Sequence, residues 1–172
     1  MSLNFTLKTN PKIAGLITTG AFITLPKPAP KLLVAFGKIM RIFLPSLLQS
    51  NNLNAEHVSK DKAVVKKYLD DPLVHDRLSV NMGIEILEAA KWLENFKGHV
   101  DMPILLMHAD EDHLTAAGGS ELLANNLDGD VTYREWAGMY HEIHNEPGQQ
   151  EVFDYTIDWI EKKIGKWSEA IK

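Results

Sequence analysis

The sequence contains no cysteine, which excludes disulfide bonds, thiolate metal sites and a cysteine nucleophile. Basic residues are outnumbered by acidic ones, 18 against 23, and the formal net charge is −5. Binding of nucleic-acid phosphates needs clustered cations, so nucleic acid is not an expected partner. Since the absence of cysteine is typical of a reducing compartment, we expect a cytoplasmic protein.

Long apolar runs are also missing. The most apolar stretch, KLLVAFGKIMRIFLPSLL (residues 31–48), is interrupted by Lys38, Arg41 and Pro45, whereas a transmembrane helix needs roughly 18 or more apolar residues in succession. The N-terminal MSLNFTLKTNP lacks the basic and apolar segments of a signal peptide. A chain of 172 residues with 45% hydrophobic and 24% charged residues instead indicates one soluble globular domain with a substantial core.

Three segments are predicted to be strands of a parallel sheet. KIAGLITTGAFI (12–23) and MPILLMHAD (102–110) are apolar without alternation, as strands buried on both faces are. VTYREWAG (131–138) is the third. Helices are predicted at 115–127 and from Pro147 onward. This alternation is typical of an α/β fold with crossover helices.

A helical insertion is predicted between the first two strands. In the predicted helix 31–44, Lys31, Lys38 and Arg41 share one side and nearly every other residue is apolar. This pattern fits a core-packed helix with extended lysines, and it also fits a cap helix that lines a lipid pocket or rests on a membrane. A short helix should begin near residue 59 or 60, and a longer one should span 79–97, with Gly98 as its C-cap.

Two clusters of polar residues follow the last two predicted strands. Asp110, Glu111 and Asp112 leave the first of these strands, and His141 leaves the second. In open α/β sheets, functional groups collect beyond the carboxyl ends of strands. A carboxylate that accepts the imidazole Nδ1–H fixes the tautomer of a general base. The order of acid before histidine is the one found in α/β-hydrolases.

The same segment also allows a metal site. HADEDH (108–113) carries His108, Asp110, Asp112 and His113 on one strand end and loop, and His141 or His144 could complete the set. Such a cluster would indicate a metallohydrolase. The site would require all these side chains to converge, although His108 is expected to lie within the strand.

The sequence resembles the C-terminal part of the monoacylglycerol lipase and lysophospholipase group of α/β-hydrolases. Four segments carry the resemblance: AGLITTGAF, YLDDPLVHDRLS, PILLMHADEDHLTAAGGSELL and AGMYHEIHNEP. It implies about three parallel strands with crossover helices and a helical cap. The implied organisation is a core strand segment at 1–24, a cap with its return helix at 25–100, and a C-terminal core at 101–172.

The resemblance also implies a function, ester hydrolysis of lipid-like acyl substrates without a metal or organic cofactor. By position, Asp112 would be the acid and His141 the general base of a serine, aspartate and histidine triad. Asp110, His144, Glu146 and His75 would have structural roles. The cap implies that the substrate is a lipid-like ester. It also implies contact with a membrane surface.

The serine nucleophile of that group is missing. It sits in a G-x-S-x-G turn, and no serine of this sequence has that setting. Ser120 lies in a predicted helix, and Ser2 stands where the group has the helix beyond the turn. We therefore expect an incomplete fragment that is inactive alone. The alternative is a non-catalytic module, derived from a hydrolase, that binds lipid or a partner.

The resemblance implies that the strand leading into the G-x-S-x-G turn is missing as well, and this strand would normally pair with the strand at AGLITTG (14–20). One edge of this strand should lack its usual neighbour, and an exposed edge invites pairing. We expect the chain to cover it by forming a homodimer, by exchanging an element, or by pairing with the missing N-terminal half.

Overall fold

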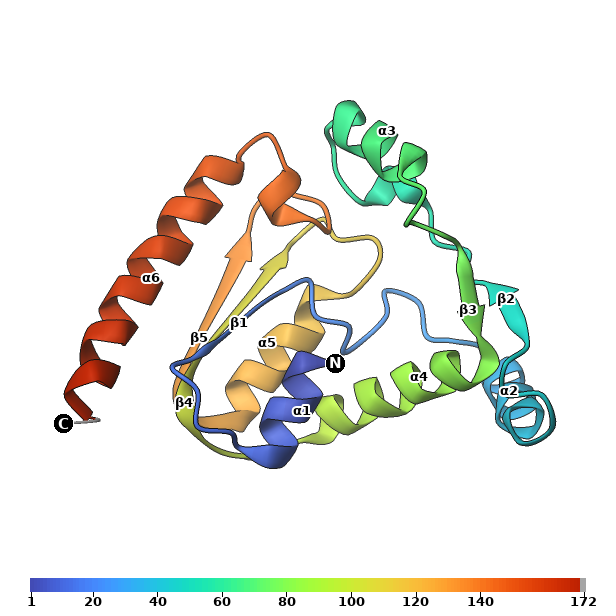
Figure 1. The fold of residues 1–172 in the computed structure, drawn as a ribbon, viewed down its shortest axis with the longest axis horizontal. Helices are drawn as coiled ribbons and strands as arrows, with labels where there is room; N and C mark the ends of the chain where they lie inside the picture. Colours follow the sequence, from blue (N-terminus) through green and yellow to red (C-terminus); the bar gives the residue numbers. More distant parts are fainter. Residues whose placement is uncertain (171–172) are drawn as a thin grey trace.

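The computed structural model describes residues 1–170 of the chain, with side-chain environments as far as Lys163. Its centre is a sheet of three parallel strands in the order β1-β4-β5 (Figure 1). The strands are β1 (Leu16–Thr19), β4 (Gly98–Ala109) and β5 (Leu127–Trp136). The predicted parallel sheet is therefore confirmed, and its middle strand is the one that precedes the acidic loop.

Helices cover both faces of this sheet (Figure 1). On one face, α1 (Ser2–Thr9), α5 (Ala117–Asn126) and the C-terminal end of α4 (Val80–Asn95) enclose a core around Ile104 and Leu106. On the other face, α6 (Gln149–Ala170) packs its Val152 and Trp159 against the alternate β4 side chains. Because β4 contributes to both cores, six of its residues in succession, 104–109, are buried, which is the pattern of a central parallel strand.

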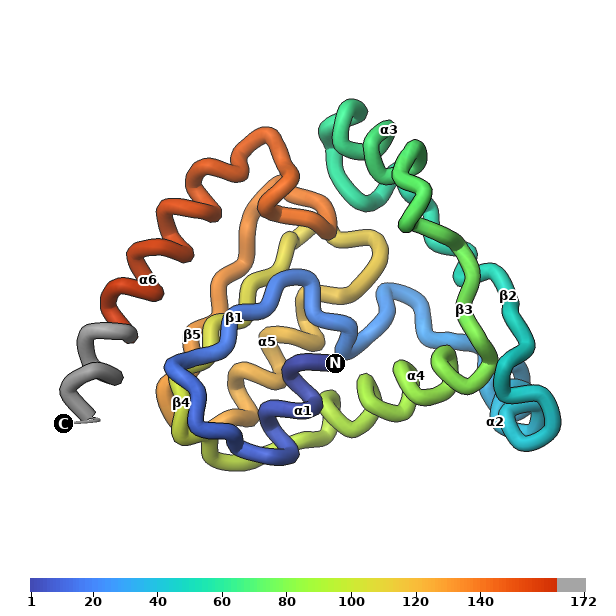
Figure 2. Tube along the Cα trace, in the orientation of Figure 1, coloured from blue at the N-terminus to red at the C-terminus, as the bar shows by residue number. Residues whose placement is uncertain are grey.

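The segment between β1 and β4 folds away from α6, and α4 connects it to the sheet (Figures 1 and 2). We call residues 25–79 the cap. Its elements are α2 (Lys31–Phe43), β2 (Leu48–Ser50), the short helix η1 (Ala55–His57), α3 (Lys62–Asp70) and β3 (Arg77–Ser79). Strands β2 and β3 form a separate antiparallel ribbon.

The helix starts follow local capping chemistry. The Ser79 side chain accepts a hydrogen bond from the Met82 N–H at the start of α4, and Asp61 does the same for Ala63 at the start of α3. Both are preferred N-cap residues. The prediction that Gly98 caps α4 is wrong, because α4 ends at Asn95, its C-cap Phe96 has an extended backbone, and Gly98 already begins β4.

The first predicted strand is much shorter than expected. Its apolar run covers residues 12–23, but β1 spans four residues, all of them only half-buried. The expectation of a strand buried on both faces is therefore wrong for β1. Within residues 1–170, β1 has a strand neighbour, β4, on one edge only, and an edge strand has less surface covered than a central one.

Helix α2 does not pack into the core. None of its residues is buried, and Leu32 and Phe43 are 84% and 73% exposed. Lys38 and Arg41 instead pair with Glu88 on α4 at 3.5 and 3.0 Å. The interpretation of α2 as a core-packed helix is therefore wrong. Among residues 1–170, no helix combines the length and the apolar character needed to cross a membrane.

The open edge of β1 gives a testable expectation about association. Among residues 1–170, β1 pairs with a strand on one side only, and its Leu16 and Ile17 are half-buried, so we expect the chain to self-associate. Sedimentation velocity between about 1 and 100 μM should show dimers or larger species rising with concentration. A compact monomer across that range would contradict this expectation.

Candidate active site

The acid and histidine loops leave the same end of the sheet. Strands β4 and β5 pair in parallel up to Ala109 and Trp136, so the residues that follow them emerge side by side. Two hydrogen bonds tie the loops together, from Asp110 N–H to the Trp136 carbonyl at 3.1 Å and from Gly138 N–H to Asp110 Oδ1 at 2.7 Å. Asp110 therefore serves as the link between the loops.

Asp112 and His141 meet between these loops. The distance from His141 Nδ1 to Asp112 Oδ2 is 2.7 Å. The Asp112 side chain is fully buried, whereas that of His141 is 27% exposed. An ionised carboxylate can only accept, so Nδ1 carries the proton and donates. Within the part of the chain that the structure describes, no hydrogen bond reaches His141 Nε2, and the side chain lies in the wall of the pocket described below.

The Asp112 carboxylate is fixed by several further donors. Its Oδ1 accepts the backbone N–H groups of Leu114 and Thr115 at 2.8 and 2.9 Å, and Thr115 Oγ1 donates to Oδ2 at 2.8 Å. Burial alone raises the pKa of Asp112, but the hydrogen bonds from His108, His141 and Thr115 outweigh it and hold the pKa well below its usual value. Asp112 is therefore ionised at neutral pH.

The His141 ring rests on Gly20, at the end of β1. Gly20 has φ +54°, and a Cβ placed on it would lie 2.8 Å from His141 Cε1. Glycine adopts this left-handed conformation readily, and it leaves room for the ring. The end of β1 thus sets how deep the imidazole lies against the sheet.

Replacing Gly20 by alanine should destabilise the chain by about 2 kcal/mol, because the left-handed backbone and the contact with His141 both penalise a Cβ. Urea unfolding measures this change. Gly118→Ala is the matched control, since Gly118 lies in α5 with nothing within 4 Å of an added Cβ. The free energy of unfolding of this second variant should rise by up to about 1 kcal/mol. Equal effects of the two variants would contradict the packing described for His141.

The histidine loop is also held from the cap. We call residues 58–61 the clamp. Glu142 N–H donates to the Val58 carbonyl at 2.9 Å, and Ser59 Oγ donates to the Asn145 carbonyl at 3.0 Å. The nearly fully buried Glu146 accepts the Lys60 N–H at 2.7 Å. The cap therefore fixes the loop that carries His141.

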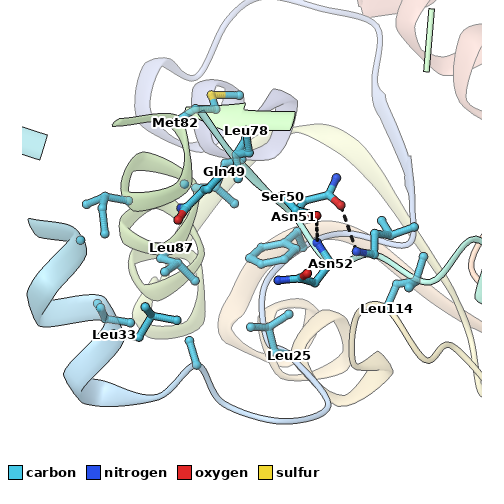
Figure 3. A pocket seen from close by; sticks show the side chains of 18 of the residues that line it. Leu25, Leu33, Gln49, Ser50, Asn51, Asn52, Leu78, Met82, Leu87 and Leu114 are labelled. Carbon is cyan, nitrogen blue, oxygen red and sulfur yellow. Dashed lines mark hydrogen bonds between the residues drawn. The ribbon is translucent and has the colours of Figure 1, made fainter. Parts of the chain in front are cut away.

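A pocket of about 950 Å³ opens between the cap and the sheet, and His141 lies in its wall. Figure 3 shows leucines of α2 and α4 on one side, Leu33 and Leu87, and the polar Ser50, Asn51 and Asn52 on another. The volume matches that of small-molecule sites. The remaining apolar lining comes mainly from the cap and α4: Leu25, Val34, Phe36, Met40, Leu47, Leu53, Leu78, Val80, Met82, Ile84 and Ile86.

The alternative metal set does not converge as a whole: His108 and His141 face the Asp112 carboxylate, but the other members lie elsewhere. Asp110 bonds the Gly138 backbone, and the His113 ring packs against His57 and Tyr140, 4.7 and 5.1 Å away between ring centroids. Within residues 1–170, no group of three or more histidine or acidic side chains is arranged to hold a metal ion. The proposed ligand set is therefore not arranged as a metal site.

The other polar residues singled out from the sequence lie apart from the Asp112–His141 pair or support it indirectly. His144 is exposed, and His75 is exposed with its Nδ1 accepting the Arg77 N–H. Ser120 is fully buried in α5 and bonds His108, so it is not placed to attack a substrate. His108 lies within β4 as predicted, but its contact with Asp112 was not anticipated.

Comparisons with known proteins identify the family. Residues 1–148 match the Hydrolase_4 family, described as serine aminopeptidase, S33. The chain belongs to this family of α/β-hydrolases. It is 30% identical over 149 residues to the monoacylglycerol lipase of Mycolicibacterium smegmatis, covering 86% of this chain and 53% of that protein. An uncharacterized abhydrolase domain-containing protein of Dictyostelium discoideum is 34% identical over 156 residues, which are 88% of this chain and 16% of that protein.

A solved structure agrees with these relatives. The crystal structure of Paleococcus ferrophilus monoacylglycerol lipase superposes with a TM-score of 0.81 at 30% identity, covering 92% of this chain and 63% of that one. The resemblance to the monoacylglycerol lipase group is therefore confirmed. The hydrolase chain described here spans about half the length of the M. smegmatis lipase.

Proposed function

We propose that this chain supplies the acid and the base of a serine ester hydrolase that acts on lipid-like acyl substrates. The main support for this proposal is the 2.7 Å hydrogen bond from His141 to the buried Asp112, at the wall of a large, mainly apolar pocket. The attacking serine comes from a polypeptide segment outside these 172 residues, since the sequence has no G-x-S-x-G.

In the proposed mechanism, His141 Nε2 takes the proton of the attacking hydroxyl while Asp112 stabilises the imidazolium that forms. His141 then returns the proton to the departing alcohol, and it activates water in the second half-reaction. Asp112 can serve this role because its hydrogen bonds keep it ionised and its orientation fixed.

The pocket supports a long-chain substrate. Each buried CH₂ group contributes about 0.8 kcal/mol, and the cap and α4 provide leucine, phenylalanine and methionine side chains for such contacts. The relatives carry lipase names, in agreement with a lipid-like ester here.

The test is a chimera in which the serine-bearing N-terminal part of the M. smegmatis lipase precedes this chain; the serine part comes first because the triad order is serine, acid, histidine. We expect hydrolysis of monoacylglycerols, with kcat/KM at least about tenfold higher for an oleoyl than for a butyryl ester. A chimera that is folded by circular dichroism and hydrolyses neither ester would contradict the proposal. Lipid binding without hydrolysis would favour the non-catalytic module.

We also propose that α2 brings the pocket to a lipid surface. Leu32, Ile42 and Phe43 are 73–84% exposed, and an apolar helix face of this kind partitions into the membrane interface. Because Lys38 and Arg41 pair with α4 carboxylates, this binding should depend little on anionic lipid.

Binding to phosphatidylcholine vesicles tests this surface by co-sedimentation. Phe43→Asp should weaken partitioning about tenfold or more, since one large apolar side chain contributes about 1.5–3 kcal/mol when buried. Leu73→Asp is the control, because Leu73 is even more exposed than Phe43, at 86% against 73%, but lies after α3. Equal loss of binding in both variants would contradict a specific role for α2.

A further inference from the structure

A second histidine, His108, contacts the carboxylate of Asp112. It lies in β4, one residue before the strand ends, and its side chain is fully buried. Its Nε2 is 3.1 Å from Asp112 Oδ2 and 3.1 Å from Thr115 Oγ1, and its Nδ1 is 2.8 Å from Ser120 Oγ. Both ring nitrogens of this buried imidazole therefore have partners.

These contacts determine which nitrogen carries the proton. An ionised carboxylate only accepts hydrogen bonds, so the nitrogen that faces Asp112 must be the donor. His108 therefore carries its proton on Nε2, and its Nδ1 accepts a hydrogen bond from the Ser120 hydroxyl. With the opposite tautomer, the Nε2 lone pair would face the carboxylate, an unfavourable arrangement in a site without solvent.

The two histidines share one oxygen. Asp112 Oδ2 accepts from His141 and Thr115 and lies 3.1 Å from His108 Nε2, while Oδ1 is occupied by two backbone N–H groups. The result is a continuous row of hydrogen bonds from Ser120 through His108, Thr115 and Asp112 to His141. One end of the row is anchored in α5, and the other end is the imidazole at the pocket.

We propose that His108 is a positioning residue for the Asp112–His141 pair. It prevents the carboxylate from rotating and so holds the oxygen that orients His141. Ser120 in turn fixes the tautomer of His108. The inference depends on the proposed function only in assigning His141 the role of base; the arrangement itself is a property of this chain.

Histidine labelled with ¹⁵N in the ring provides a test without turnover. Long-range proton–nitrogen correlation spectra of the 172-residue chain should show His108 protonated on Nε2 and His141 protonated on Nδ1. A proton on His108 Nδ1 alone would overturn the proposal. This measurement needs no variant, so a substitution that fails to fold cannot leave the proposal untested.

Two substitutions separate positioning from simple packing. In His108→Leu the donor to Asp112 is lost, and we expect the low-field Nδ1–H proton of His141 to exchange with water about tenfold faster, as loss of a bond to a charged group predicts. His108→Gln keeps an amide donor and should largely restore the slow exchange. Equal exchange in wild type and a folded His108→Leu would overturn the proposal.

Ser120→Ala is the milder variant. It keeps His108 and removes only the donor to Nδ1, so we expect a smaller acceleration of the same His141 signal. No change in the signal would contradict the role given to Ser120. Since none of these readouts requires ester hydrolysis, failure of the chimera to hydrolyse esters and failure of this proposal are distinguishable.

Discussion

Replacing His141 by glutamine should lower ester hydrolysis by the chimera about 10⁴-fold or more. Glutamine cannot accept the proton of the attacking hydroxyl, and loss of one triad member typically has an effect of this size. The 2.7 Å bond to Asp112 and the free Nε2 make His141 the side chain placed to accept that proton. The effect should appear in kcat/KM and in kcat alike.

His144→Gln is the matched control for this prediction. His144 lies three residues further along the same loop and is exposed, so the substitution should change the rate less than about twofold. Comparable losses in the two variants would show that the loop conformation, and not the imidazole of His141, accounts for the effect.

Replacing Asp112 by asparagine should cost about 3 kcal/mol of stability at pH 7. The carboxylate accepts four hydrogen bonds, from His141, Thr115 Oγ1 and two backbone N–H groups, and its Oδ2 also lies 3.1 Å from His108 Nε2. An amide offers one acceptor oxygen and turns an NH₂ group toward remaining donors, which leaves buried polar groups unpaired. Urea unfolding measures this difference in stability. The same substitution should also lower the activity of the chimera.

This difference should shrink in acid. The hydrogen bonds hold the pKa of folded Asp112 below its ordinary value of 3.8, so its stabilising contribution is complete above that pH and declines below it. At pH 2.5 the gap between wild type and Asp112→Asn should be smaller by about 1.5 kcal/mol. Asp110→Asn is the control. Asp110 is exposed, and the asparagine side chain still offers an acceptor oxygen to the Gly138 N–H. A gap that stays constant with pH would contradict the depressed pKa.

Much of the site could be predicted because it depends on local sequence patterns, namely apolar strands followed by polar loops. The strand before Asp112 is apolar and the loops after both strands are polar, so parallel pairing of β4 and β5 brings Asp112 and His141 to one edge. The helix starts at Ser79 and near Asp61 likewise follow from capping residues.

The contacts that were missed depend on long-range packing. The clamp reaches the histidine loop across 86 positions of sequence, from Ser59 to Asn145, and no local pattern indicates that Glu146 is buried there. The sequence marks His108 as a strand residue and a candidate metal ligand, but its contact with Asp112 depends on the loop that turns Asp112 back onto the His108 ring. The length of β1 was overestimated because an apolar run does not show how many neighbouring strands cover it.

The most direct test of the central claim is covalent labelling with a fluorophosphonate probe, followed by intact mass. The 172-residue chain should remain unlabelled at 19.3 kDa, because the proposed acid and base have no activated serine beside them in this chain. The chimera should gain one adduct, on the serine of its G-x-S-x-G turn, and His141→Gln should abolish that labelling. An adduct on the chain alone, or a folded chimera that stays unlabelled, would contradict the account.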